Sequence, residues 1–234
     1  MSQPIKAFTQ ESAIEAIRSH DTVHLTALLN FFKSELQEHT EVIKEISSSS
    51  EFLQALSDVT SNFKSDQIFT IIYQIIEIFL PLLPEEEKVT FIDTGFEFCL
   101  PEALNSENVE FLLETINFIS FLSKQTDYAI DTFFSFGIHT QLLDIAEKNL
   151  NNPDTNSKAV VRTALKVVFE LFGEQENILS TILQSELPRI TKMLLDCNDI
   201  DEKKTLLQTI TEITNQRSSF SFILFESEAV SEIY

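Results

Sequence analysis

The segment FFSFGIHTQLLDIAEK (residues 133–148) joins two apolar helical patterns through a glycine. The whole chain contains three glycines, so the placement of one between a phenylalanine-rich stretch and an amphipathic stretch is informative. Glycine adopts a positive φ without a clash of a Cβ atom, and such a backbone conformation lets two helices meet at a sharp angle. Gly137 is therefore predicted to form a tight turn between two helices.

The same kind of break recurs along the chain at intervals of 42 to 49 residues. The other breaks are placed at Glu51, Gly95, Glu186 and Glu228. Apolar residues follow most breaks at offsets of 1, 5 and 8, and after Gly137 these are Ile138, Leu142 and Ile145. These offsets lie on one face of a helix. The sequence therefore predicts a repeat that contains a short helix, a tight turn, a second helix, a loop and a longer third helix.

The third helix of each repeat carries one polar residue between mostly apolar neighbours. The five segments are LLNFF, IIEIF, TINFI, VFELF and ITEIT, and their central residues are Asn30, Glu77, Asn117, Glu170 and Glu212. A helix that is apolar on nearly all sides around one polar position is sandwiched between neighbouring helices. We expect the five residues to face a shared groove. Two alternatives stay open: they are solvated positions on the groove wall, or they hydrogen-bond to a neighbouring repeat.

The repeats divide the chain into a single predicted domain, residues 1–234. A partial repeat (9–38) is followed by four fuller repeats (39–83, 84–125, 126–174 and 175–216) and by a second partial repeat (217–234). The last one has no third helix, so Leu224, Phe225 and Val230 are expected to be poorly covered, although the ends of helical arrays need polar caps. A longer native chain or a homodimer through the C-terminal end would cover them.

A strand alternative exists for two segments, VTFIDTGFEF (89–98) and SFSFILF (219–225), because apolar residues alternate in both. Their helical neighbours and the shared register favour helices instead. The sequence therefore predicts an all-α protein.

The charge of the chain limits its partners. Acidic residues number 37 and basic residues 16, which gives a net charge of −21. A surface this negative repels nucleic acid and anionic lipid and attracts basic protein segments.

The most apolar stretch, residues 68–83, contains Gln74 and Glu77 and is too short to span a membrane. Cys99 and Cys197 lie in apolar helical patterns and are predicted to be buried thiols. We therefore expect a cytoplasmic protein, with a nuclear location as the alternative.

Residues for catalysis or metal binding are sparse. His20 and His24 have the spacing of two ligands on one helix, but Asp21 is predicted to begin a new helix between them. The segment DCNDIDEKK (196–204) resembles a calcium loop but lacks its central glycine. Phosphate-binding glycine loops and serine-nucleophile motifs are absent from the sequence. We predict no catalytic residue, no cofactor and no metal site.

The three-helix repeat, with glycine between its first two helices and a polar residue midway along the third, resembles the armadillo repeat; the two-helix HEAT repeat is the nearest alternative. The resemblance implies a right-handed α-solenoid whose third helices line a concave groove. In members that bind extended protein segments, asparagines on the third helices hydrogen-bond the partner's backbone. Asn30 and Asn117 match that column, whereas Glu77, Glu170 and Glu212 replace asparagine with a carboxylate.

The predicted function is a non-enzymatic scaffold or adaptor that holds a protein partner in this groove. Carboxylates along the groove would attract Lys or Arg, so the expected partner is a basic segment. The alternative function is a regulatory subunit or domain of an enzyme or cytoskeletal regulator, such as the armadillo-like inhibitory region of formins or a phosphatase or kinase scaffold.

Overall fold

The computed structural model describes residues 9–62, 65–94, 99–173, 186 and 188–216. All regular elements among these residues are helices, so the prediction of an all-α protein is confirmed. The chain divides into two compact units. Unit 1 comprises Met1–Ala103 and Lys124–Ala129, and unit 2 comprises Leu104–Ser123 and Ile130–Tyr234. Each unit is described by itself.

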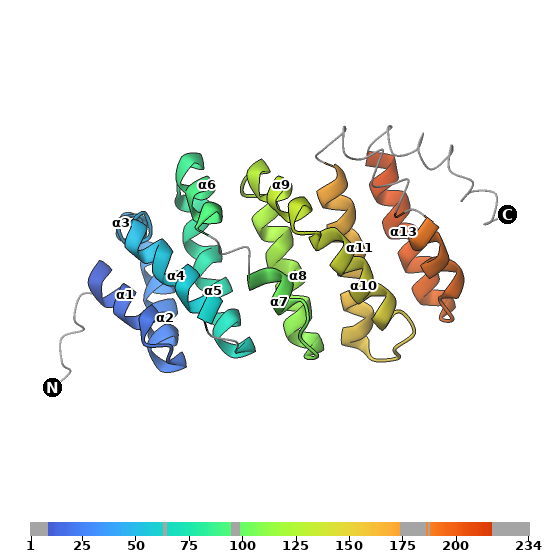
Figure 1. The fold of residues 1–234 in the computed structure, drawn as a ribbon, viewed down its shortest axis with the longest axis horizontal. Coiled ribbons are helices and arrows are strands. Elements are labelled where there is room, and N and C mark those ends of the chain that lie inside the picture. The colour runs from blue at the N-terminus through green and yellow to red at the C-terminus, as the bar shows by residue number, and fades with distance from the viewer. Residues whose placement is uncertain (1–8, 63–64, 95–98, 174–185, 187, 217–234) are drawn as a thin grey trace. The chain divides into compact units, whose positions relative to one another are not determined.

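Unit 1 is built from the helices of the N-terminal half (Figure 1). In order they are α1 (Gln10–Arg18), α2 (Thr22–Glu38), α3 (Thr40–Ser47), α4 (Ser50–Asn62), α5 (Asp66–Phe79), the 3-10 turn η1 (Leu80–Leu82), α6 (Glu85–Asp93) and α7 (Leu100–Ala103). Short polar side chains fix the helix starts. Thr9 and Ser12 form a capping box at α1, and the Asp21 carboxylate accepts a hydrogen bond from the Val23 N–H at α2. Residues 89–93 of the possible strand segment therefore lie in helix α6.

The core of unit 1 contains a row of phenylalanines that links four helices. Phe32 of α2, Phe52 of α4, Phe79 of α5 and Phe91 of α6 are all fully buried. Successive ring centroids lie 6.1, 5.6 and 5.8 Å apart, and both contacts of Phe79 have edge-on geometry. We call these four residues the phenylalanine row. In the same unit α2 packs along α5, and α1 packs along α4. Helices that occupy the same place in successive predicted repeats therefore lie side by side.

Unit 2 is organised around one long helix (Figure 1). Its elements are α8 (Val109–Ser123), α10 (Ile138–Asn149), α11 (Thr155–Gly173), a helical stretch over residues 188–196, and α13 (Ile200–Gln216). Helix α9 (Asp127–Ser135) contributes residues to both units. Helix α11 packs against α8, α10 and α13 and buries Val161, Leu165 and Val168. Helix α11 is thus packed between neighbouring helices, as the apolar pattern around Glu170 predicts.

The turn at Gly137 has the predicted geometry. Gly137 lies between α9 and α10 with φ 66° and ψ 24°, in the left-handed region. Its N–H donates to the Phe134 carbonyl at 3.0 Å, and its own carbonyl accepts from the Thr140 N–H at 3.0 Å. Phe136 and Gly137 are therefore the whole connection between α9 and α10, and Gly137 is the N-cap of α10.

Replacing Gly137 by alanine should lower the unfolding free energy by about 1 kcal/mol. A Cβ atom at this position would have no atom within 4 Å, so the cost comes from the positive φ and not from a clash. Urea denaturation of both proteins measures the difference. Gly137→Asn is the matched control and should lose less, because asparagine tolerates the left-handed region better than alanine. Equal stability of Gly137→Ala and wild type would contradict this account of the turn.

Some helix boundaries differ from the sequence prediction. The first predicted break, at Glu51, falls instead at Ser48 and Ser49, because the Ser49 hydroxyl accepts a hydrogen bond from the Phe52 N–H and helix α4 has already begun at Ser50. Cys99 and Cys197 are buried thiols, as predicted. The predicted turn at Gly95, the break at Glu228 and the last partial repeat (217–234), with Leu224, Phe225 and Val230, lie outside the described residues.

Candidate partner-binding surface

In unit 1 the predicted groove residues are brought to one exposed face. Asn30 lies on α2 and Glu77 on α5, and both are exposed. Helix α5 is otherwise largely buried, whereas α2 buries one side, with Leu25, Leu28, Leu29 and Phe32. Lys33 Nζ of α2 donates to Gln74 Oε1 of α5 at 3.4 Å, which ties the two helices together on this face. Lys33 and Gln74 each lie about one helical turn from the predicted residues. Asn30 and Glu77 therefore share the exposed face of two packed third helices.

In unit 2 the corresponding residues lie on α8 and α11. Asn117 is exposed on α8, whereas Glu170 of α11 is half-buried. Ser120 of α8 donates to Glu170 Oε2 at 2.7 Å, and Lys166 Nζ lies 3.8 Å from Glu170 Oε1. Glu170 therefore hydrogen-bonds to the neighbouring third helix, which is one of the alternatives that the sequence left open. Glu212 lies on α13, and its side chain is outside the described residues.

Helix α11 carries a basic stripe that the sequence prediction did not include. Lys158, Arg162 and Lys166 follow one another at intervals of four residues, so they lie along one side of the helix. The spacing is visible in the sequence SKAVVRTALK (157–166), although the net charge of the whole chain is strongly negative. The third-helix face of unit 2 is therefore not uniformly acidic.

The stripe is held by ion pairs to the start of α13. Arg162 binds Glu202 with two parallel hydrogen bonds, Nε to Oε1 at 2.8 Å and Nη2 to Oε2 at 2.5 Å. The Glu202 side chain is 2% exposed and the Arg162 side chain 44% exposed. The hydrogen bonds to Glu202 raise the pKa of Arg162. Lys158 Nζ binds Asp199 Oδ2 at 2.5 Å, which raises the pKa of Lys158 and lowers that of Asp199.

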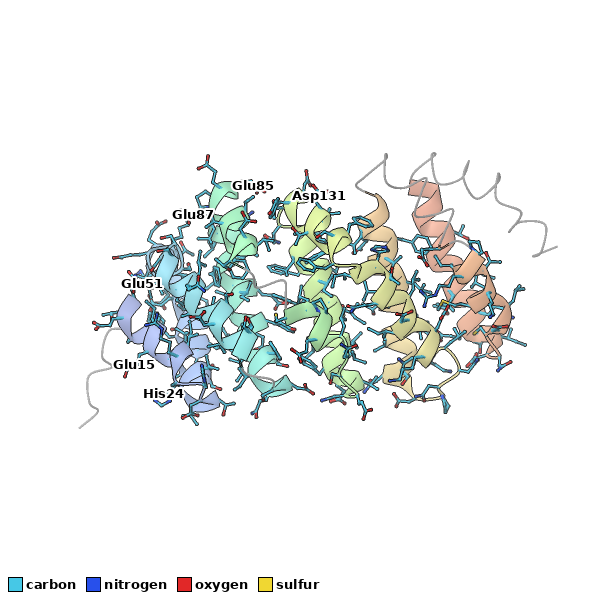
Figure 2. All side chains as sticks on the ribbon, in the orientation of Figure 1. Glu15, His24, Glu51, Glu85, Glu87 and Asp131 are labelled. Atoms are coloured by element: carbon cyan, nitrogen blue, oxygen red, sulfur yellow. The ribbon has the colours of Figure 1, made fainter. Side chains whose placement is uncertain are left out.

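Much of the negative charge of unit 1 lies away from the third helices. Helices α1, α3 and α4 line an open hollow of about 920 Å³ that contains Glu11, Glu15, Glu45 and Glu51 together with Arg18. Figure 2 marks Glu15 on α1 and Glu51 on α4. The first turn of α6 adds Glu85, Glu86 and Glu87. In unit 1, negative charge alone therefore does not identify the third-helix face as the binding surface.

A second ion-pair cluster joins α10 to the helix at 188–196 in unit 2. Arg189 donates to the carboxylates of Asp144 and Glu147, with a 2.6 Å bond from Nε to Glu147 Oε1. These bonds raise the pKa of Arg189 and lower that of Glu147. The His139 ring contacts the Phe134 ring in a tilted arrangement, with centroids 5.0 Å apart. Burial lowers the pKa of His139 against the opposing effect of Glu186. These groups fasten one helix to the next.

The described residues contain no gathering of three or more His, Cys, Asp or Glu side chains that could hold a metal ion. His24 lies in the first turn of α2, where its Nδ1 is 3.1 Å from Asp21 Oδ2, while His20 precedes the helix with a φ of 53°. Asp21 therefore begins a helix between the two histidines, as predicted. None of the helices in the described part of the chain combines the length and the apolar character that a membrane crossing requires.

Comparisons with known proteins support the fold alone. No protein-family model and no curated protein sequence matches the chain. Among solved structures, the chain is similar to a crystal structure described as an engineered protein from the Northeast Structural Genomics Consortium. The TM-score is 0.61 at 15% sequence identity, and the match covers 95% of this chain and 85% of that chain. At this identity the similarity extends to the helical architecture and carries no information about function.

Proposed function

We propose that the protein is a non-enzymatic scaffold of armadillo-type repeats whose third-helix faces hold a segment of a partner protein. Side-by-side packing of corresponding helices supports the repeat architecture: α2 with α5 and α1 with α4 in unit 1, and α11 with both α8 and α13 in unit 2. Repeat arrays offer a large binding area on one face without catalytic geometry.

The observation that carries the proposal is the position of the lone polar residues. Ile75, Ile76 and Phe79 around Glu77 are buried, and Glu77 itself is exposed. Leu28, Leu29 and Phe32 surround the exposed Asn30 in the same way. A polar side chain at the open side of an otherwise sandwiched helix can contact a partner without disturbing the core. In unit 1 the carboxylate of Glu77 favours a basic side chain of that partner.

Charge reversal at Glu77 tests the proposal. Glu77→Lys should weaken binding to a basic partner by about 2- to 5-fold, because one exposed charge pair contributes about 0.2–1 kcal/mol and reversal adds repulsion. The unfolding free energy should change by less than about 0.5 kcal/mol, as for other exposed positions. Proteins that the intact chain captures from a cell extract would be identified by mass spectrometry, and the affinity of each variant for the purified partner would then be measured.

Glu51→Lys is the matched control, because it makes the same charge change on an exposed residue of α4. If Glu51→Lys weakens binding as much as Glu77→Lys, the partner responds to total charge or to the α1–α4 surface, and the proposal is wrong. Glu170 is a poorer position for this test, because its bond with Ser120 couples binding to the packing of α8 on α11.

A further inference from the structure

The third-helix face of unit 2 carries charges of both signs, one on each of two neighbouring helices. Helix α8 exposes Glu110 and Glu114, which are four residues apart, and helix α11 exposes Arg162 and Lys166, also four residues apart. Residues at this spacing lie one above the other on the same side of a helix. A ligand that crosses from α8 to α11 therefore meets negative charge first and positive charge second.

Two hydrogen bonds place these charges on the same face and at the same level. Asn156 Nδ2 of α11 donates to Glu110 Oε1 of α8 at 3.2 Å, and Ser120 of α8 bonds to Glu170 of α11. Glu114 lies between the two α8 positions, and Arg162 and Lys166 lie between the two α11 positions. Along the two helices, Glu114 is therefore level with the middle of the basic stripe.

The ion pairs of α11 present their positive ends to solvent. In the Arg162–Glu202 pair the glutamate side chain is almost fully buried, whereas the arginine side chain is 44% exposed. In the Lys166–Glu170 pair the side chains are 61% and 26% exposed, so the cation is again the outer member. Arg162 uses Nε and Nη2 for Glu202, and Nη1 is the remaining nitrogen of the guanidinium group. A carboxylate that approaches from solvent meets two cations before it meets their counter-ions.

We propose that the α8–α11 face binds a protein segment of mixed charge, with a basic side chain over Glu110 and Glu114 and an acidic side chain over Arg162 and Lys166. This inference rests on the proposed function, since it names the partner chemistry of the same kind of face. Packed helices lie about 8–10 Å apart, and an extended chain advances about 3.3 Å per residue. The two charged residues of the segment are therefore about three positions apart.

Synthetic peptides of equal length test the charge pattern on the full chain. Four peptides in a Gly–Ser–Thr background carry two charged residues three positions apart: Lys then Asp, Asp then Lys, two Lys, or two Asp. Backbone NMR titration gives both the affinity and the location of each peptide. One of the two mixed peptides should bind about five-fold more tightly than either like-charged peptide, with shifts at Asn117, Ser120 and Lys166.

Lys166→Glu is the informative variant, because Lys166 is exposed and lies outside the buried pair of Arg162. It should move the preference to the peptide with two lysines. Lys148→Glu, at an exposed position at the end of α10, makes the same charge change elsewhere in unit 2 and should leave the order of affinities unchanged.

The other outcomes show whether the mixed-charge inference, the scaffold proposal or both are wrong. If the peptide with two lysines binds wild type most tightly at this face, the mixed-charge inference is wrong and the scaffold proposal stands. If Lys166→Glu leaves the preference for the mixed peptide unchanged, Lys166 does not select the acidic residue. If no peptide shifts residues of this face, both the inference and the use of this face for binding are wrong.

Discussion

Replacing Phe79 by alanine is expected to lower the unfolding free energy by about 4 kcal/mol. Phe79 is fully buried and is an inner member of the phenylalanine row, with edge-on ring contacts at 5.6 Å to Phe52 and 5.8 Å to Phe91. The alanine variant loses the transfer free energy of the ring and leaves a cavity that helices α4, α5 and α6 can only partly close. Urea denaturation followed by circular dichroism measures the change.

Two further variants show whether the loss comes from the row. Phe79→Leu keeps most of the side-chain volume and should lose about 1–2 kcal/mol. Phe31→Ala removes the same ring from a half-buried position on α2 and should lose clearly less than Phe79→Ala, because part of that ring already contacts water. Similar losses for Phe31→Ala and Phe79→Ala would mean that the row is not the structural centre of unit 1.

Replacing Arg162 by alanine is expected to have the second-largest effect, a loss of about 2–4 kcal/mol in unit 2. The variant leaves the carboxylate of Glu202 buried without the two hydrogen bonds that Arg162 provides. We expect a smaller loss of unfolding free energy than for a fully buried ion pair, because the Arg162 side chain is about half exposed and water can reach the site. Urea denaturation again gives the measurement.

A double variant separates the cost of leaving the Glu202 charge buried from the cost of losing the packing of Arg162. In the Arg162→Ala background, the additional change Glu202→Gln removes the buried charge and should restore a substantial part of the stability. Lys158→Ala breaks the neighbouring pair with Asp199, in which both side chains contact solvent, and should have a much smaller effect. An Arg162→Ala variant as stable as Lys158→Ala would show that the Glu202 carboxylate is solvated or has other partners.

Asn30 and Glu77 of unit 1 show what a local sequence pattern can predict. Asn30 and Glu77 are each the one polar residue within an apolar segment, and both are exposed on packed helices. In such a helix the polar residue must lie on the side that neighbouring helices do not cover, since burying a polar group without a partner costs free energy. Local periodicity therefore identified the residues without any knowledge of the tertiary contacts.

Glu170 followed the same pattern, but its surroundings could not be predicted. Whether its carboxylate faces solvent or bonds to Ser120 depends on the rotation of α11 relative to α8, and residues 50 positions apart do not encode that rotation in a local pattern. The bond between Arg162 and Glu202, over 40 positions, is hidden for the same reason. A net charge of −21 likewise describes the whole chain and not one face of it.

The sequence alone determined that the chain is helical, where the Gly137 turn lies, and which residues interrupt the apolar third helices, because each of these properties depends on neighbours within a few turns of one helix. The tertiary structure alone decided which carboxylates are paired and which face carries cations, because ion pairs between helices depend on interhelical angle and rotation. Those two quantities are set by the packing of the whole core of a unit.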